Sequence, residues 1–294
     1  MNAAHINYQD QTLTEDDRTC LILPLFHIFG LVAGFFANAM ADSVIYIPKD
    51  IRTDTLLELM SKEQCTVFHS VPTMLIALMN NKAFDREKLG SLRCTIISGA
   101  AATETQIRQF KEAMPNNHFL SSYGMSEMAP VSITEYDDTD EHVTGTDGKP
   151  VKNIRIRIYD NAAGKECAVG EPGEIQVQGY NLMLGYYKDA LDDQSIDAGG
   201  WLHTGDLGCM LPDGYLKLTG RIKELIIRGG ENIMPGEVEA AISSLGYVEN
   251  VKVMGVPSEF FGEEVACALV LKGGAAFDEN AIKNELALKL SKFK

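Results

Sequence analysis

The stretch TVFHSVPTMLIALMN, residues 66–80, changes its pattern at one proline. TVFHS is a short apolar run typical of a buried strand, and PTMLIALMN begins with a proline, which suits the first position of a helix. The same alternation continues on both sides, with strands predicted at VIYI (44–47), CTIISG (94–99) and HFLSSYG (118–124) and helices at DTLLELMSKEQ (54–64) and TETQIRQFKEAM (103–114). Strands separated by helices predict parallel βαβ units, and hence an α/β fold whose sheet is covered on both faces.

After residue 150 the pattern has a period of two instead. Apolar and polar residues alternate in VKNIRIRIYD (151–160) and GEIQVQG (173–179), and Asp213-Gly214 suits a tight hairpin turn. These segments predict antiparallel strands in a small β-barrel or sandwich.

A third pattern begins near Lys223. IKELIIR (222–228), the helix-like PGEVEAAISSL (235–245), the runs VENVKVMGV (248–256) and EVACALVLK (264–272), and a final helix over 278–292 predict a small C-terminal α+β domain. We therefore predict a large domain over residues 1–221, with its α/β part at about 1–150 and its β-barrel part at about 151–221, and a small domain over 222–294.

The charge of the chain disfavours whole classes of partner. Its 294 residues carry a formal net charge of −15, from 41 acidic against 26 basic side chains. This excess disfavours nonspecific binding to nucleic acid or to anionic membranes, so any anionic ligand must be held by local groups. The six cysteines are widely spaced and contain no C-x-x-C pair, which indicates neither a zinc site nor a disulfide framework. We interpret them as reduced, mostly core residues of a cytoplasmic protein.

One stretch, LILPLFHIFGLVAGFFANAMA (21–41), has no charged side chain and is long enough to span a bilayer. It nevertheless contains Pro24, His27 and Asn38, and acidic residues precede it, opposite to the basic start of a signal peptide. We therefore expect a buried strand over 20–23, a turn at Pro24 and a buried helix, and we weigh a membrane span as the weaker alternative.

Polar side chains gather where the strand at 118–124 ends. In open α/β sheets, ligands bind beyond the carboxyl ends of the strands. There SSYGMSEMAP (121–130) offers the ring of Tyr123, the flexible Gly124, the hydroxyl of Ser126 and the carboxylate of Glu127. These groups can stack on a base, admit it closely, bind a phosphate and hold Mg²⁺. On these residues alone, an ordinary polar loop is the stronger alternative.

Asp206 lies in the glycine-flanked turn TGD, residues 204–206. A fixed aspartate there can accept hydrogen bonds from both hydroxyls of a ribose, and a turn-capping aspartate is the equal alternative. Arg221, fifteen positions further on and across the predicted hairpin, can supply a cation for a phosphate or the ribose.

Taken together, ordered blocks of the sequence resemble the signature blocks of the adenylate-forming superfamily, which includes acyl-CoA synthetases, aryl-CoA ligases, luciferases and adenylation domains. The blocks are PLFHIFG (24–30), ISGAA (97–101), YGMSE (123–127), GYNLMLGYYKD (179–189), GWLHTGDLG (200–208) and DGYLKLTGRIKELIIRGGENIMPGEVE (213–239). The resemblance covers nearly the whole chain. It implies that a carboxylic acid attacks the α-phosphorus of ATP to give an acyl-adenylate, and that the thiol of coenzyme A then gives a thioester and AMP.

The resemblance also implies roles for individual residues in the nucleotide site. Tyr123 would stack on adenine, Ser126, where many relatives have threonine, would contact phosphate, and Glu127 would hold Mg²⁺. Asp206 would hold the ribose, and Arg221 the ribose or a phosphate. The implied cofactors are ATP/AMP and Mg²⁺, with coenzyme A as co-substrate.

Further positions follow from the same blocks. His27 would line the acid pocket or gate its junction with the thiol tunnel, with a buried core histidine as the alternative. Lys223 would lie at the hinge between the two domains. The wall near adenine and the acid would contain Ser98, Gly99 and Ala100, and Gly124 and Met125 would be further cofactor-binding positions. The loop that swings toward the thiol tunnel would contain Gly229 and Gly230. The apolar residues around Met125 indicate a fatty or aryl carboxylic acid.

Two blocks of the family are absent. The glycine- and hydroxyl-rich phosphate loop should precede PLFHIFG, but residues 1–20 contain nothing like it, and Lys294 is not the lysine that the family uses near its carboxyl terminus. The sequence resembles the middle and much of the end of a longer enzyme. We expect impaired adenylation, because loss of such a charge donor costs on the order of a thousandfold in rate. We also expect self-association through an exposed sheet edge.

Three hypotheses for the function follow. The first is an acid–thiol ligase that makes acyl-CoA, with impaired activity in this chain. The second is a non-catalytic remnant that binds AMP or coenzyme A, and the third is an adenylation domain that loads a carrier protein.

Overall fold

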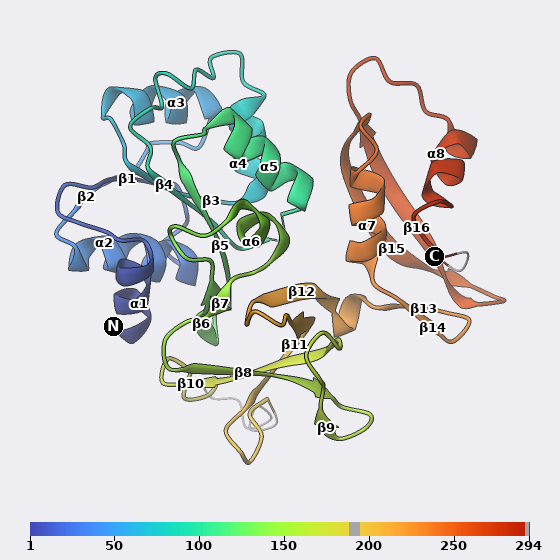
Figure 1. Cartoon of the computed structure of the whole chain (residues 1–294). Coiled ribbons are helices and arrows are strands. Elements are labelled where there is room, and N and C mark those ends of the chain that lie inside the picture. The colour runs from blue at the N-terminus through green and yellow to red at the C-terminus, as the bar shows by residue number, and fades with distance from the viewer. Residues whose placement is uncertain (101, 188–194, 292–293) are drawn as a thin grey trace. The chain divides into compact units, whose positions relative to one another are not determined.

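The computed structural model describes residues 1–100, 102–187, 195–291 and 294 (Figure 1). Its first sheet has seven strands in the order β2-β1-β3-β4-β5-β6-β7. They are β1 (Arg18–Leu21), β2 (Val44–Tyr46), β3 (Val67–Ser70), β4 (Cys94–Ile97), β5 (His118–Met125), β6 (Met128–Ile133) and β7 (Lys149–Pro150). The pairings from β2 to β5 are parallel, as the sequence predicts, whereas β6 and β7 add an antiparallel extension that the sequence patterns do not predict.

The helices beside these strands are α1 (Asn2–Asp10), the π-helix η1 (Phe29–Phe36), α2 (Ala37–Met40), α3 (Thr53–Lys62), α4 (Pro72–Met79), α5 (Glu104–Ala113) and α6 (Asp140–Gly145). Helices α3, α4 and α5 begin within one residue of the predicted positions, whereas the sequence patterns do not predict α1 and α6. Helix α5 starts with a capping box, in which the Thr103 side chain accepts from the Gln106 backbone and the Gln106 side chain accepts from the Thr103 backbone. Within the described residues, no helix is both long enough and apolar enough to cross a membrane.

The two faces of the parallel sheet are covered by different elements. Alternate strand residues such as Cys20, Phe68 and Phe119 join one buried cluster with residues of α3, α4 and α5. On the opposite face, the His69 ring meets Phe29 of η1 edge-on at 5.7 Å. Burial lowers the pKa of His69 to about 4, so this histidine is a neutral core residue at physiological pH.

A charged pair joins the amino ends of the parallel strands. Asp17, just before β1, is 2% exposed and accepts two hydrogen bonds from the Arg93 guanidinium, at 2.8 and 2.6 Å. The same carboxylate accepts from the Thr66 hydroxyl at 2.6 Å and from the Thr14 backbone at 2.9 Å. Because Thr66 precedes β3 and Arg93 precedes β4, one carboxylate fixes the starts of three neighbouring strands.

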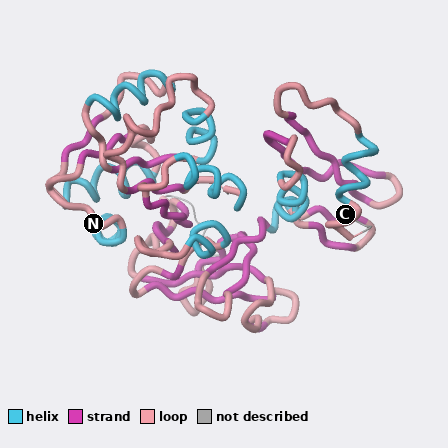
Figure 2. The backbone as a smooth tube through the Cα atoms, turned by 45° about the horizontal axis from the view of Figure 1, so that its top comes forward, coloured by secondary structure: helices cyan, strands magenta, loops and turns pink. Residues whose placement is uncertain are grey.

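The predicted antiparallel region forms a second sheet, in which the described residues between 151 and 221 are strands and loops only (Figure 2). Its five strands have the order β12-β11-β10-β8-β9. They are β8 (Ile154–Asp160), β9 (Lys165–Glu166), β10 (Gly173–Gly179), β11 (Leu202–Met210) and β12 (Leu216–Arg221). The predicted strands are present, and in the described part of the chain no strand pairing closes them into a barrel.

The C-terminal segment, orange to red in Figure 1, has its own sheet and core. Its strands β13 (Ile226–Arg228), β14 (Glu231–Ile233), β15 (Val248–Ser258) and β16 (Gly262–Leu271) have the order β14-β13-β16-β15 and follow the short 3-10 helix η3 (Ile222–Glu224). Helices α7 (Pro235–Ser243) and α8 (Glu279–Leu286) contribute Val238, Ile242 and Ile282 to the core. The final helix ends at Leu286, six residues before its predicted end at 292, and residues 292–293 lie outside the described part.

Two glycines make the tight turn between β13 and β14. Arg228 pairs with Glu231, so Gly229 and Gly230 are the two turn residues, with φ values of +59° and +89°. Positive φ at both central positions is the requirement of a type I′ hairpin turn. A Cβ on Gly229 would also lie 3.2 Å from the Phe261 ring.

The contacts of the chain divide into two compact units. The first unit contains residues 1–157, 176–203 and 210–217, and the second unit contains residues 158–175, 204–209 and 218–294. The domain boundary predicted at 221/222 and the hinge at Lys223 stay predictions.

We expect Asp17→Asn to lower the free energy of unfolding by about 2 kcal/mol, because the substitution leaves the Arg93 guanidinium without its carboxylate. Burial alone would raise the pKa of Asp17, but hydrogen bonds from Arg93 and Thr66 outweigh it and lower the pKa. The contribution of Asp17 is therefore present above pH ~4 and is lost as the pH falls through its folded-state pKa. Urea denaturation of both proteins across this acid range measures the effect, with the exposed Asp16→Asn as control; equal stability of Asp17→Asn and wild type would contradict it.

We expect Gly230→Ala to destabilise the second unit by about 1 kcal/mol, because an L-residue resists positive φ. Gly230→Asn should lose less stability than Gly230→Ala, since asparagine tolerates positive φ better than alanine does. Gly246→Ala is the control, because its Cβ would meet nothing within 4 Å and its φ lies outside the left-handed region. Denaturation midpoints measure the difference, and a Gly230→Ala variant as stable as the control would show that the turn is not strained.

Candidate functional site

Apart from His27, the predicted site residues of the first unit lie just after β4 or in the last part of β5 and the turn that follows it. Ser98 follows β4, and its hydroxyl donates to the Ser122 carbonyl of β5 at 2.7 Å. Gly99, with a φ of +83°, and Ala100 are exposed at this end of the sheet. Ala101, the last residue of the ISGAA block, lies outside the described residues. Ser98, Gly99 and Ala100 thus lie just after the carboxyl end of β4, the kind of position at which open α/β sheets bind ligands. Their place in a wall near adenine and the acid stays a prediction.

The YGMSE block forms the end of one strand and a tight turn, rather than the loop after a strand that the sequence pattern suggests. Met125 pairs with Met128, so Ser126 and Glu127 are the turn residues between β5 and β6. Gly124 lies where the register of the two strands shifts, and a Cβ there would approach Ala129 to 3.3 Å. Glycine therefore permits a close approach of β6 at this point.

The three side chains predicted to bind nucleotide differ in accessibility. Ser126 is exposed and Glu127 is half-buried, so both can meet a ligand. Tyr123 is only 8% exposed and is therefore buried. Its role in stacking on adenine stays a prediction.

Glu127 has a partner that the sequence does not identify. Its Oε1 accepts a hydrogen bond of 2.5 Å from the hydroxyl of Tyr186, and its backbone carbonyl accepts from the Met183 backbone at 2.8 Å. Tyr186 belongs to the GYNLMLGYYKD block, and membership of this block is the one feature of the sequence that could have pointed to Tyr186. Lys188 and Asp189 at the end of the block lie outside the described residues.

His27 is exposed, in the turn that precedes η1. Its Nδ1 accepts a hydrogen bond from the Phe29 backbone at 3.2 Å, so the neutral ring carries its proton on Nε2. The alternative of a buried core histidine is wrong for His27 and applies instead to His69, which is 0% exposed. The exposed ring is available to a ligand, and its place in the acid pocket stays a prediction.

In the second unit, the structure brings Asp206 and Arg221 together. Asp206 of β11 is 5% exposed, and its Oδ1 accepts from Nε of Arg221, at the end of β12, over 2.9 Å. The backbone N–H of Asp206 donates to the Thr204 hydroxyl at 3.0 Å, and Gly205 between them has a φ of +71°. The prediction of a turn at residues 204–206 is wrong, because these residues lie within strand β11. The carboxylate is buried there beside Arg221, whose side chain is 65% exposed and remains open to a ligand.

The other predicted residues of the second unit lie further along the chain. Lys223 is exposed in η3, two residues after Arg221. Gly229 and Gly230 form the hairpin turn described above, and the Gly229 backbone N–H donates to the Phe261 carbonyl at 2.8 Å. Turn geometry therefore explains both glycines, and their movement toward a thiol stays a prediction.

The side chains fit Mg²⁺ only as part of a complex with a nucleotide. Among the residues that the structure describes, no group of three or more His, Cys, Asp or Glu can hold a metal ion by itself. Mg²⁺ is usually bound through one or two carboxylates together with substrate phosphates and water. Glu127 suits this role, because Oε1 is held by Tyr186 and Oε2 has no hydrogen-bond partner within the described ranges.

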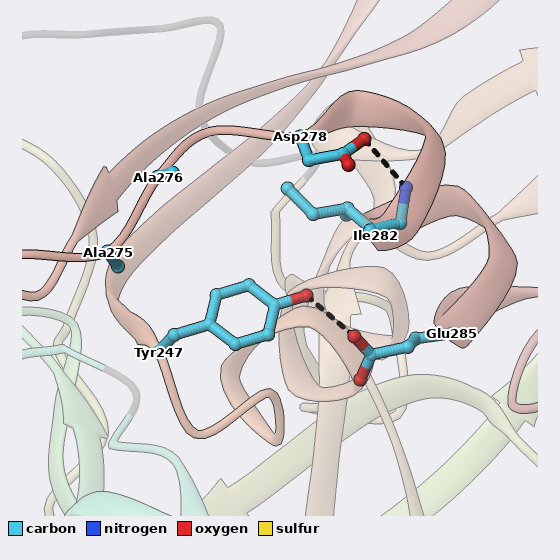
Figure 3. A pocket seen from close by; sticks show the side chains of 7 residues that line it. Tyr247, Ala275, Ala276, Asp278, Ile282 and Glu285 are labelled. Carbon is cyan, nitrogen blue, oxygen red and sulfur yellow. Dashed lines mark hydrogen bonds between the residues drawn. The ribbon is translucent and has the colours of Figure 1, made fainter.

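A hollow of about 280 Å³ in the second unit contains none of these residues. Figure 3 shows Tyr247 and Glu285 pointing toward each other across it, joined by a hydrogen bond of 3.0 Å. The rest of its lining is Ala275, Ala276, Asp278, Ala281 and Ile282. Its polar groups already pair with each other or cap α8, so the hollow indicates no particular ligand.

Comparison with known proteins agrees with the ordered blocks. The family model for AMP-binding enzymes matches residues 1–187. A putative acyl-CoA synthetase, YngI of Bacillus subtilis, is 36% identical over 296 residues, which cover 100% of this chain and 54% of the relative. The mitochondrial medium-chain acyl-CoA ligase ACSF2 of Homo sapiens is 31% identical over 95% of this chain and 46% of its own length. The chain thus spans about half the length of the curated relatives that it matches.

Solved structures of adenylate-forming enzymes have the same fold as this chain. ATP-bound MatB from Rhodopseudomonas palustris matches with a TM-score of 0.93 and 30% identity, over 100% of this chain and 57% of that one. The o-succinylbenzoate CoA synthetase MenE of Bacillus subtilis, in complex with its acyl-adenylate intermediate, matches with a TM-score of 0.85 and 29% identity over 99% and 58%. Since the family model covers more than half of the sequence and both folds agree, the chain belongs to the AMP-binding enzymes, the family of the acyl-CoA synthetases and ligases.

Proposed function

We propose that this chain takes part in the ATP-dependent activation of a carboxylic acid to an acyl-adenylate and in transfer of the acyl group to coenzyme A. The observation that carries the proposal is the pair of Asp206 and Arg221, a buried carboxylate beside an exposed guanidinium. Such a pair offers acceptors for ribose hydroxyls next to a cation for a phosphate or ribose oxygen. In a chain of net charge −15, this local cation is needed to attract an anionic nucleotide.

The residues at the ends of β4 and β5 would supply further contacts. The Ser126 hydroxyl would donate to a phosphate oxygen, and Tyr123 would stack on adenine. Ser98, Gly99 and Ala100 would line the wall beside them, where a glycine admits a flat ligand closely. Bound Mg²⁺ would neutralise phosphate charge during attack by the carboxylic acid, and Glu127 would hold it.

The acid that we propose is a fatty or aryl carboxylic acid. His27 is exposed at the start of the apolar helix η1, next to Phe26, which is 93% exposed. An imidazole beside an apolar surface suits a ligand with a carboxylate and an apolar tail. Medium-chain acyl-CoA ligase is the name of one relative, which supports an apolar acid for this chain too. The cytoplasmic location and self-association through an exposed sheet edge stay predictions.

We expect Asp206→Ala to weaken AMP binding in the presence of Mg²⁺ by about tenfold or more, because hydrogen bonds to a charged group are worth about 1.5–3 kcal/mol. Isothermal titration of the purified chain with AMP measures the affinity. Asp213→Ala, on the turn between the same two strands, is the control and should bind as wild type does. Unchanged AMP affinity of Asp206→Ala, in a variant with wild-type thermal stability, would remove Asp206 from the site.

We expect the chain to form a thioester when it is given a synthetic acyl-adenylate and coenzyme A, because this step does not require the phosphate loop for ATP. Mass spectrometry detects the thioester product. A parallel reaction uses a phosphopantetheinyl carrier protein in place of coenzyme A as the acceptor. Transfer to the carrier alone would favour a carrier-loading adenylation domain, and transfer to neither, with AMP still bound, would favour a non-catalytic module.

A further inference from the structure

Tyr186 contacts the turn residue to which we assign Mg²⁺, although the two lie 59 positions apart in the sequence. Its hydroxyl donates to Oε1 of Glu127 over 2.5 Å. This distance is short for an O–H···O hydrogen bond. The second oxygen, Oε2, has no such partner in the part of the chain that the structure describes.

Two further hydrogen bonds hold the segment that carries Tyr186 against the β5–β6 hairpin. The Asn181 side-chain amide donates to the Pro130 carbonyl at 3.0 Å, and the Met183 backbone donates to the Glu127 carbonyl at 2.8 Å. The Leu182 backbone N–H turns back to the Gly179 carbonyl at the end of β10. The hydroxyl of Tyr186 is therefore brought to Glu127 by an anchored segment, and the contact does not depend on one side chain alone.

We propose that Tyr186 is a positioning residue, which fixes the Glu127 carboxylate so that Oε2 faces a divalent cation on the bound nucleotide. The inference rests on the proposed function, because it assumes that Glu127 binds this cation. Restriction of the carboxylate matters, since a glutamate side chain otherwise gives up considerable rotamer freedom when it binds. Hydrogen-bond partners of metal ligands typically contribute 10–100-fold to metal affinity.

The test is isothermal titration with ATP, once with saturating Mg²⁺ and once with EDTA. The ratio of the two affinities measures how strongly Mg²⁺ and the nucleotide bind together. We expect Tyr186→Phe to lower this ratio about tenfold, or to abolish it, while the affinity in EDTA stays within about twofold of wild type. The matched control is Tyr180→Phe, because both tyrosines are 45% exposed and each substitution removes one hydroxyl.

A double-mutant cycle shows whether Tyr186 acts through Glu127. Glu127→Gln should abolish the Mg²⁺ dependence, and adding Tyr186→Phe to Glu127→Gln should change nothing further, because residues that act through each other are not additive. Additive effects would overturn the proposal. So would a wild-type ratio in Tyr186→Phe, or an equal loss of ATP affinity with Mg²⁺ and with EDTA, which would indicate a general structural role.

The outcomes separate this inference from the proposed function. A wild-type chain that binds ATP equally with and without Mg²⁺ overturns the role of Tyr186 and leaves nucleotide binding intact. A wild-type chain that binds neither ATP nor AMP overturns both. If Tyr186→Phe does not fold, ¹⁹F NMR of the wild-type chain labelled with 3-fluorotyrosine replaces it. Addition of Mg²⁺ to the ATP complex should then shift one tyrosine resonance that Tyr180→Phe does not remove, and the absence of any shift overturns the proposal.

Discussion

The bidentate pair of Asp17 and Arg93 is the constraint on which the arrangement of the first sheet depends. Parallel strands cannot be joined by tight turns, so their starts must be aligned by other contacts. The Asp17 carboxylate supplies them with four hydrogen bonds that reach the segments before β1, β3 and β4. With these strands in register, β4 ends beside Ser121 of β5, and Ser98 contacts Ser122 just beyond that point.

Much of this architecture follows from the sequence, for identifiable reasons. The short runs of β3 and β4 are buried throughout, β1 is buried after Arg18, and the cap at Thr103 marks the start of α5. Helix α1 gives no comparable signal, because it buries the polar Asn7 and its flanking Gln11 is fully buried as a partner of His69. Strand β6 is hidden as well, since the turn before it uses Ser126 and Glu127 rather than the glycine or asparagine that marks most hairpins.

The candidate site also contains contacts that the sequence predicts and contacts that it does not. The pairing of Asp206 with Arg221 is predictable from the sequence. Asp213-Gly214 indicates a hairpin turn, and a hairpin places residues on its two strands side by side. The contact between Tyr186 and Glu127 is not predictable, because it depends on the path of a loop that no periodic pattern describes. The exposure of His27 is also a tertiary property, since its apolar neighbours in the sequence suggest burial.

The charged pair of Asp17 and Arg93 and the segment from Ser98 to Ala100 lie at opposite ends of the parallel strands, and this separation affects how such a protein can change. Substitutions in the turns at the carboxyl ends need not disturb the four hydrogen bonds that align the strand starts. Ligand preference can therefore diverge through turn residues while the sheet keeps its register. For the same reason, loops exchanged between relatives at this end of the sheet should be tolerated better than exchanges that separate Asp17 from Arg93.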